Sequence, residues 1–196
     1  QRRMFHFYAM LSRMKLINRW GLMRNTRSEN ICEHSFDTAV IAHALAVLRN
    51  RRFGGHVNAE RTALLALFHD STEIVTGDMP TPVKYYNPEI RAAYRKVEEA
   101  ARTRLLGFLP DDLRPEYRPL LGEPLDSDRE LLPLVKAADK LSAVIKCVEE
   151  QRMGNSEFAS AETTLRKAVE DLHLPEADCF VQEFLPSYSL TLDEQK

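Results

Sequence analysis

The sequence predicts an all-α protein with a single domain. Apolar residues recur every three to four positions along almost the whole chain, a spacing typical of amphipathic helices. No stretch shows the sustained apolar–polar alternation that indicates a half-buried strand. A chain of 196 residues with 44% hydrophobic residues can bury one substantial core. We expect this domain to span residues 1–196, with its core at about 4–186 and a loose C-terminal tail.

The N-terminal part of the chain is predicted to form three helices. The first covers about residues 4–19, where apolar residues form a stripe, and a polar connection at 21–30 follows. The second runs from about 33 to 52 and ends at a pair of glycines. Asn58 is a suitable N-cap for the third helix, which carries a long apolar run and ends at Gly77.

The middle of the chain is predicted to contain a loop, a helix and short turns. Two prolines within residues 78–87 indicate an ordered loop. Asn87 is an N-cap residue and Pro88 suits the first helical position, so a helix should begin there and run to about 106. Four prolines interrupt residues 107–126, which predicts short turns at most.

A long helix should follow these turns. Ser127 and Glu130 have the spacing of a capping box, which predicts a helix from this point to about residue 153. Pro133 then either marks the true start of the helix or kinks it. Two shorter helices are expected at 155–172 and 176–184.

Charge and cysteine content limit the class of protein. The formal net charge is −2 and the pI is about 6.3, so the chain as a whole lacks the basic character of a nucleic-acid-binding protein. Its three cysteines are too few and too scattered for a disulfide framework, which favours free thiols in a reducing compartment. No signal sequence is recognisable, and no apolar run approaches membrane-spanning length. We therefore expect a cytoplasmic protein with no nucleic-acid partner and no membrane partner.

A histidine and two carboxylates end the apolar run of the third helix. His69 and Asp70 follow that run directly and Glu73 comes one turn later, so helical spacing places all three on one side. Imidazole and carboxylate groups together suit a divalent transition metal. His34 and Asp139 are polar at core-facing positions of two other helices. Each of these is more commonly explained by a structural partner, so spacing alone predicts only a candidate metal site.

The order of these residues along the chain carries a family resemblance. A histidine, a His-Asp pair and a distant aspartate, all on helices, resemble the HD-domain metal-dependent phosphohydrolases, which are helical bundles. Three segments narrow the likeness to the bacterial YfbR-like 5′-deoxynucleotidase family: LINRWGLMRNTRSENICEHSF at 16–36, HDSTEIVTGDMPTPVKYYN at 69–87 and VKAADKLSAVIKCVEE at 135–150. The likeness extends over most of the chain and implies an HD-domain helical bundle.

The resemblance implies a metal-dependent 5′-deoxynucleotidase. Its substrates would be deoxyribonucleoside 5′-monophosphates, which it would hydrolyse to deoxynucleoside and inorganic phosphate while discriminating against ribonucleotides. His34, His69, Asp70 and Asp139 would bind one divalent metal ion per chain. Cobalt supports activity well in the family, and manganese or another transition metal can substitute. The family also implies a homodimer.

Further site residues follow from the same resemblance. Arg19 and Trp20 match the family's phosphate-facing and sugar-facing pair, and they join Glu73, proposed for proton transfer, as the catalytic set. The substrate-binding set consists of Arg19, Trp20, His34, His69, Asp78, Met79, Pro80, Thr81 and Asp139. Gly21 and Met79 differ from the family example, and this difference concerns only the shape of the pocket.

The chemistry of these residue types leaves some roles open. The planar fork of Arg19 can meet two phosphate oxygens. Glu73 can accept a proton from water or deliver one to the leaving 5′-oxygen, and the sequence does not decide between these roles. Trp20 would otherwise be a core or boundary anchor. Asp78 would otherwise be a turn-forming residue after Gly77.

Two other functions are alternatives. One is a different HD phosphohydrolase that acts on a cyclic dinucleotide, a triphosphate or an alarmone. The other is a non-catalytic helical regulatory or nucleic-acid-binding module, although binding alone does not require an acid beside a metal site. The remaining histidines are interpreted as non-catalytic: His6, His43, His56 and His173.

Overall fold

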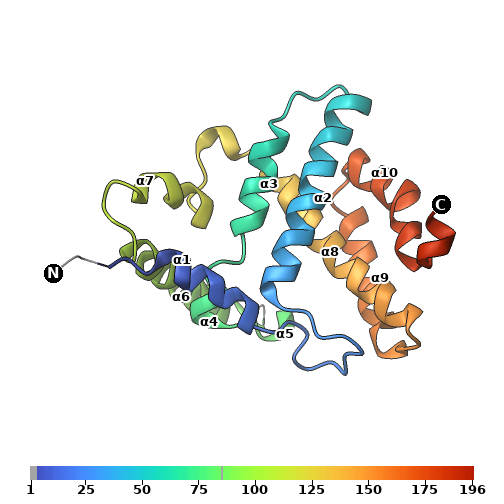
Figure 1. Ribbon diagram of the computed structural model, residues 1–196, viewed down its shortest axis with the longest axis horizontal. Coiled ribbons are helices and arrows are strands. Elements are labelled where there is room, and N and C mark those ends of the chain that lie inside the picture. The colour runs from blue at the N-terminus through green and yellow to red at the C-terminus, as the bar shows by residue number, and fades with distance from the viewer. Residues whose placement is uncertain (1–3, 85) are drawn as a thin grey trace.

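The computed structural model describes residues 4–84 and 86–196. Within these ranges the regular elements are helical, and the one strand-like contact is an isolated antiparallel bridge between Asn18 and Asn30. The prediction of an all-α fold is confirmed (Figure 1).

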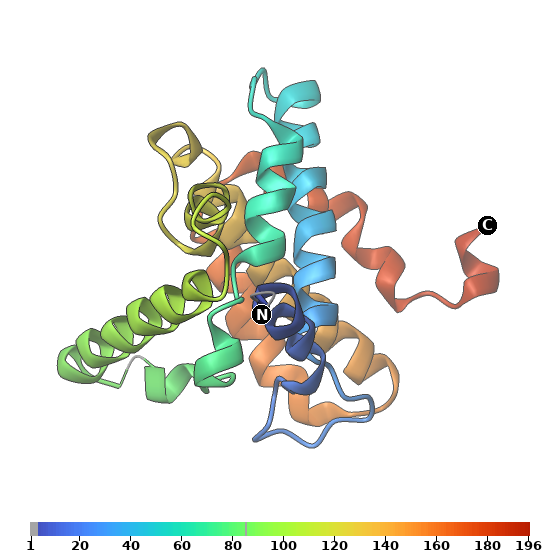
Figure 2. The ribbon, with the colours of Figure 1, turned by 60° about the vertical axis from the view of Figure 1, so that its left-hand side comes forward.

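Two long helices and a shorter one form the centre of the molecule. α2 (Ile31–Arg52) lies beside α3 (Ala59–Phe68), and both pack on α8 (Leu132–Arg152). α9 (Ala159–Glu170) packs on α8, and α10 (Pro175–Glu183) packs on α2. Figures 1 and 2 both show α2 and α3 running next to each other, and in Figure 1 α9 and α10 lie on the other side of α2.

The core between the central helices is apolar. Leu45 of α2 and Leu134 and Leu141 of α8 are completely buried in one cluster, and burial of each such side chain contributes about 2 kcal/mol. α2 begins at a capping box in which Asn30 and Glu33 each accept a hydrogen bond from the other's backbone N–H. This cap determines where the helix that carries His34 begins.

A second group of helices lies at one side of this centre. α6 (Pro88–Gly107), whose start agrees with the prediction, projects sideways (Figure 2) and packs against α1 (Phe7–Leu11). The completely buried ring of Phe7 belongs to the apolar cluster between them. Phe68 and Tyr117 contact both this cluster and the central core, so they connect the two parts of the fold.

The N-terminal helix is shorter than predicted. α1 continues into a 3₁₀ turn, η1 (Ser12–Leu16), and Ile17 is already extended with φ −106° and ψ 108°. The backbone of Ile17 and Arg19 instead pairs with residues 29–31. The prediction was therefore wrong for the last helical turn, because backbone pairing with a distant segment satisfies the same polar groups.

The third predicted helix is interrupted at the candidate metal ligands. α3 ends just before His69, residues 69–72 form a turn, and α4 (Glu73–Thr76) follows. The His69 N–H bonds to the Ala66 carbonyl at 3.3 Å, three residues back instead of four. The chain leaves α4 at Gly77, as predicted, with φ +72°.

Short elements occupy the regions predicted as loops and turns. The expected loop at 78–87 contains one helical turn, α5 (Thr81–Lys84). The remaining short elements are α7 (Arg114–Tyr117), η2 (Arg118–Leu121), η3 (Asp126–Asp128), η4 (Ser156–Phe158), η5 (Leu185–Ser189) and η6 (Leu192–Gln195). The predicted helix at 155–172 is thus divided between η4 and α9.

The start of α8 shows which role Pro133 has and corrects the predicted capping box. α8 begins one residue before Pro133, so the proline marks the helix start and does not kink it. The capping box expected at Ser127 and Glu130 is wrong. Asp128 caps a 3₁₀ turn through a backbone N–H and pairs with Arg61 at 2.7 Å, so this tertiary ion pair determines the local structure.

One helix is long and apolar enough to count as a candidate membrane span, which was not expected from the sequence. By length and composition, α2 (Ile31–Arg52) is long and apolar enough to cross a membrane, contrary to the expectation that no apolar run approaches that length. Half of its apolar window is buried inside the fold, and the core helix of a soluble protein passes the same test.

Candidate active site

Three segments that are distant in sequence bring four possible metal ligands together. His34 lies near the start of α2, His69 and Asp70 lie in the turn after α3, and Asp139 lies on α8. The ligand atoms of His34, His69 and Asp70 all lie within 4.8 Å of one another. Oδ1 of Asp139 lies 3.0 Å from Nε2 of His34 and 3.6 Å from Nε2 of His69. The four residues expected to bind metal are therefore neighbours.

Hydrogen bonds on the outer side of each imidazole orient it. Nδ1 of His34 lies 3.0 Å from Oγ of Ser142, and Nδ1 of His69 lies 2.6 Å from the carbonyl oxygen of Ala66. Because a carbonyl can only accept, Nδ1 of His69 donates there, which leaves Nε2 as the ring nitrogen that faces the carboxylates. Both rings thus turn Nε2 toward the centre of the cluster, as metal-binding histidines do.

The donor set fits a divalent cation. Nε2 of His69 is buried and has no hydrogen-bond partner among the residues that the structure describes, and such orphaned polar atoms are rare in protein interiors. Oδ2 of Asp70 lies 3.2 Å from this nitrogen and 3.5 Å from Nε2 of His34. Two imidazole nitrogens and two carboxylates form the mixed donor set that transition metals accept.

The electrostatics of the cluster also favour a cation. Burial alone would lower the pKa of His69, but the charge of Asp70 and the nearby carboxylate of Asp139 outweigh it and raise the pKa well above its usual value. Burial would raise the pKa of Asp139, but the hydrogen bond with His34 and the nearby imidazole of His69 hold it well below its usual range. The carboxylates of Asp70 and Asp139 thus remain ionised and draw positive charge to this point.

Glu73 is a buried acid next to the metal cluster. It is the first residue of α4, and its Oε2 has no hydrogen-bond partner in the described part of the chain. Burial raises the pKa of Glu73 to about 8, and the charges of Asp70 and Asp78 add to this effect. A carboxyl group with such a pKa can carry a proton at neutral pH, as general acid–base chemistry requires.

Lys84 lies beside Glu73, although it was not among the predicted site residues. Its Nζ lies 3.9 Å from Oε1 of Glu73 and 3.5 Å from Oε1 of Glu98, and it sits over the ring of Tyr94 at 4.7 Å. The sequence carried little signal for this role, because a lysine in a loop is usually solvated. Only the packing of α5 against α6 shows that Lys84 belongs to the site.

Arg19 and Trp20 lie together at the entrance of the polar connection. Nη1 of Arg19 lies 2.7 Å from Oε2 of Glu29, and Nε1 of Trp20 donates to the same oxygen at 3.0 Å. Burial opposes the charge of Arg19, but Glu29 and then the carboxylates of the metal cluster outweigh it and raise the pKa. Sequence reasoning missed Glu29, because a carboxylate in a polar connection has no periodic signal.

The predicted substrate loop lies partly next to these residues. Asp78 is half-buried and accepts a hydrogen bond from the backbone N–H of Trp20, while burial raises its pKa. The Pro80 carbonyl accepts the first hydrogen bonds of α5. Among the polar contacts of the described residues, none joins the side chain of Met79 or Thr81 to the metal cluster. Their assignment therefore stays a prediction.

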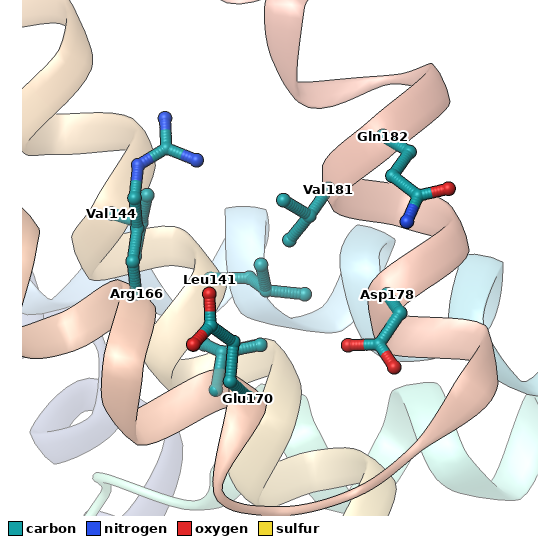
Figure 3. A pocket seen from close by; sticks show the side chains of 8 residues that line it. Leu141, Val144, Arg166, Glu170, Asp178, Val181 and Gln182 are labelled. Carbon is teal, nitrogen blue, oxygen red and sulfur yellow. The ribbon is translucent and has the colours of Figure 1, made fainter.

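A separate hollow lies elsewhere in the molecule. A pocket of about 110 Å³ opens between α8, α9 and α10 (Figure 3). Its lining residues are Leu141, Val144, Arg166, Val169, Glu170, Asp178, Val181 and Gln182. None of them is a predicted ligand or substrate residue. The candidate active site is therefore identified by converging donor atoms, not by this cavity.

Sequence comparisons point to one family. The family model described as 5′-deoxynucleotidase YfbR-like matches residues 6–188. A curated 5′-deoxynucleotidase of Photorhabdus laumondii is 52% identical over 191 residues, which cover 97% of this chain and 96% of the relative. A 5′-deoxynucleotidase of Yersinia pseudotuberculosis (serotype O:3, strain YPIII) has the same identity and coverage.

Solved structures show the same fold. An HD-domain phosphohydrolase from Listeria innocua superposes with a TM-score of 0.75 at 26% identity, covering 93% of this chain and 88% of that chain. The cyanophage S-2L HD phosphohydrolase DatZ, solved with dA and one catalytic Zn²⁺ ion, gives a TM-score of 0.64 at 19% identity, with 91% and 96% covered. The second likeness concerns the fold alone. Together they confirm the expected HD-type helical bundle.

Proposed function

The chain belongs to the YfbR-like 5′-deoxynucleotidase family, and we propose that it hydrolyses deoxyribonucleoside 5′-monophosphates to deoxynucleoside and inorganic phosphate. The observation that carries this proposal is the convergence of His34, His69, Asp70 and Asp139 next to the buried acid Glu73. A phosphate monoester dianion repels nucleophiles, so its hydrolysis needs positive charge and a placed proton donor or acceptor. This site contains groups suited to both tasks.

The four clustered side chains would hold one divalent metal ion. Cobalt is our first choice in vitro, with manganese or another transition metal as a substitute. When bound, such an ion supplies Lewis acidity toward a phosphoryl oxygen and makes a water more acidic. Ser142 and the Ala66 carbonyl keep the two imidazoles turned toward the ion.

Arg19 would bind the phosphate. Its Nη1 is engaged by Glu29, and the guanidinium keeps further N–H donors for phosphate oxygens. The charges of Asp139, Asp70 and Asp78 help to raise the pKa of Arg19, which supports a guanidinium that stays charged beside the metal cluster. An arginine beside a metal neutralises the phosphate from a second side.

Glu73 would transfer the proton. Its raised pKa supports delivery of a proton to the leaving 5′-oxygen, and acceptance of a proton from the attacking water is the alternative. Lys84 stabilises the ionised form of Glu73 from the α5 side. The site thus contains a proton carrier that is not itself a metal ligand.

Trp20 and Asp78 would recognise the sugar. The backbone N–H of Trp20 faces Asp78 and lowers its pKa slightly, so the two residues are neighbours. Asp78 would accept a hydrogen bond from the 3′-hydroxyl, and the indole would form a wall that excludes a 2′-hydroxyl. Met79, Pro80 and Thr81 would complete this side of the pocket.

The proposal includes a homodimer in the cytoplasm. Phe36, Val40 and Val47 recur at helical spacing on α2 and are exposed, as are Leu190 and Leu192 near the C-terminus. Exposed apolar side chains that recur along one surface are typical of interfaces. Free cysteines suit a reducing compartment. Light scattering after size-exclusion chromatography should give the mass of two chains, and a monomer mass at micromolar concentration would contradict the dimer.

One assay tests the central proposal. Phosphate release is measured from paired deoxyribonucleoside and ribonucleoside 5′-monophosphates with cobalt, manganese, magnesium or a chelator. We expect turnover of the deoxy substrates with cobalt and no turnover with the chelator. Turnover only of a cyclic dinucleotide, triphosphate or alarmone would favour a different HD phosphohydrolase. Nucleic-acid binding at moderate salt without phosphate release would favour the non-catalytic module.

A further inference from the structure

Residues 17–19 and 29–31 pair through their backbones and so join the two ends of the polar connection. The Arg19 N–H donates to the Glu29 carbonyl at 2.9 Å, and the Ile31 N–H donates to the Ile17 carbonyl at 2.9 Å. An antiparallel bridge joins the residues between them. Residues 20–28 therefore form a closed loop whose two ends are held together next to the metal cluster.

Glu29 lies at this closure with its side chain turned inward. The residue is only 8% exposed. One oxygen, Oε2, receives both the Arg19 guanidinium at 2.7 Å and the Trp20 indole N–H at 3.0 Å. Hydrogen bonds to an ionised, buried carboxylate are short and strong. A single carboxylate thus connects the proposed phosphate-binding and sugar-facing side chains.

Trp20 has a strained backbone whose polar groups are all engaged. Its φ is +59°, which is unfavourable for a residue with a large side chain. The carbonyl accepts from the Met23 N–H at 2.9 Å and from Nδ2 of Asn25 at 3.2 Å, and its own N–H faces Asp78. The ring packs on Phe158 at 5.3 Å between centroids. Such strain persists only where several contacts hold it.

The far side of the loop is attached to α8. The N–H and hydroxyl of Thr26 donate to Oε2 of Glu150 at 2.9 and 2.6 Å, and the Arg27 N–H donates to its Oε1 at 3.2 Å. Lys146 pairs with the same carboxylate and donates to the Arg27 carbonyl at 2.5 Å. With the base and the far side of the loop both held, the Glu29 carboxylate sets the positions of the Arg19 and Trp20 side chains.

From these contacts we infer that Glu29 is a positioning residue that determines the selectivity of the site for deoxyribose. The inference rests on the proposed function. Glu29 does not reach the reacting atoms; it holds the indole wall against the sugar position and the guanidinium toward the phosphate position. Loss of its charge should let the indole move, which would admit a 2′-hydroxyl, and should weaken phosphate binding for both sugar types.

The test compares Glu29→Gln with Glu33→Gln in the metal-loaded full chain. Glu33→Gln removes the same charge four residues later, and glutamine preserves the capping box of α2. The substrates are dAMP and AMP. Trp20 is the only tryptophan in the chain, so intrinsic fluorescence reports directly on the Glu29 contact. Bound metal per chain is measured for each variant.

We expect Glu29→Gln to change the Trp20 emission and to lower the dAMP-to-AMP ratio of kcat/KM about 10-fold, the effect of losing one charge-assisted hydrogen bond. KM for dAMP should rise more than kcat falls, and metal content should stay the same. Glu33→Gln should match the wild type in all readouts. An unchanged ratio and emission in Glu29→Gln, with normal wild-type turnover of dAMP, would overturn the role of Glu29.

A second variant separates positioning from general damage to the fold. Trp20→Phe retains an aromatic ring on Phe158, but it removes the indole N–H that donates to Glu29 and makes the ring smaller. In the Trp20→Phe background, Glu29→Gln should lower the dAMP-to-AMP ratio of kcat/KM no further, because the hydrogen bond between the indole and Glu29 is already absent. A full additional loss would contradict the inference. Absence of dAMP hydrolysis by the wild type would instead contradict the proposed function itself.

Discussion

Ser142 lies 3.0 Å from Nδ1 of His34, on the side of the imidazole that faces away from Asp139. Both partners are buried. The hydroxyl can accept from Nδ1–H, which leaves Nε2 as the nitrogen that faces Asp139 and would bind a metal. The separation of Ser142 and Asp139 by three residues on α8 places them on one helix face, so that a single helix supplies both a ligand and the group that orients another ligand.

Ser142→Ala should therefore weaken metal binding without removing it. Loss of such an outer hydrogen bond typically costs ~10–100-fold in metal affinity. Competition with a chelating dye measures the affinity directly, and activity at saturating metal should recover most of the wild-type value. An affinity equal to that of the wild type would show that Ser142 does not orient His34.

His69→Ala should lose metal and activity together. The substitution removes a buried donor whose Nε2 faces the carboxylates, and the remaining ligands cannot complete the shell. Metal analysis by mass spectrometry gives the stoichiometry for the wild type and the variant. His43→Ala is the matched control, because His43 is an exposed histidine on α2. An unchanged stoichiometry in His69→Ala would contradict its assignment as a ligand.

Glu73→Ala should keep the metal and lose most turnover. General acid–base catalysis by a placed side chain typically contributes ~10²–10⁴-fold, and kcat should fall by that order. The substitution also removes a buried carboxyl group with an unpaired oxygen, so thermal stability should not suffer strongly. Full activity in this variant would remove Glu73 from the mechanism.

Lys84→Met should shift the pH–rate profile. Lys84 lowers the pKa of Glu73, whereas burial and neighbouring carboxylates raise it to about 8. Removal of the positive charge raises this pKa further, so the limb of the profile that reports Glu73 should move to higher pH. Lys96→Met, an exposed substitution on α6, should leave the profile in place. A shift of that limb to lower pH would contradict the role of Lys84.

Glu150→Gln should destabilise the protein in a pH-dependent way. Burial opposes ionisation of Glu150, but hydrogen bonds from Lys146, Thr26 and Asn155 outweigh it and lower its pKa below the ordinary 4.5. A lowered pKa contributes stability above pH 4.5 and loses that contribution as the pH falls toward the folded-state value. Near pH 7 the variant should lose about 3 kcal/mol, because Lys146 stays buried without its partner.

Urea unfolding between pH 7 and pH 3 tests this prediction. The difference in the free energy of unfolding between wild type and Glu150→Gln should be constant above about pH 4.5 and shrink below it. The double variant Lys146→Met/Glu150→Gln should recover part of the loss, since it leaves no unpaired charge. A difference that grows as the pH falls would contradict the ion-pair explanation.

Local signals in the sequence predicted the helical architecture well. Asn87 and Pro88 marked the start of α6, and Gly77 marked the end of α4, because caps and left-handed turns depend on residues within one turn. The local signals were wrong where a distant segment competes for the same groups. Residues 17–19 pair with 29–31, and Arg61 engages Asp128 near the expected capping box.

The residue types of the metal cluster were visible in the sequence, and their order pointed to one family. By itself the sequence thus determined the helices, their apolar faces and the set of possible ligands, because these follow from spacing along one chain. Only the tertiary structure decided that Glu29 and Lys84 join the site, and which oxygen or nitrogen each group presents. Hydrogen bonds and buried charges act over a few ångströms in space, and the sequence alone does not specify which distant side chains come within that range.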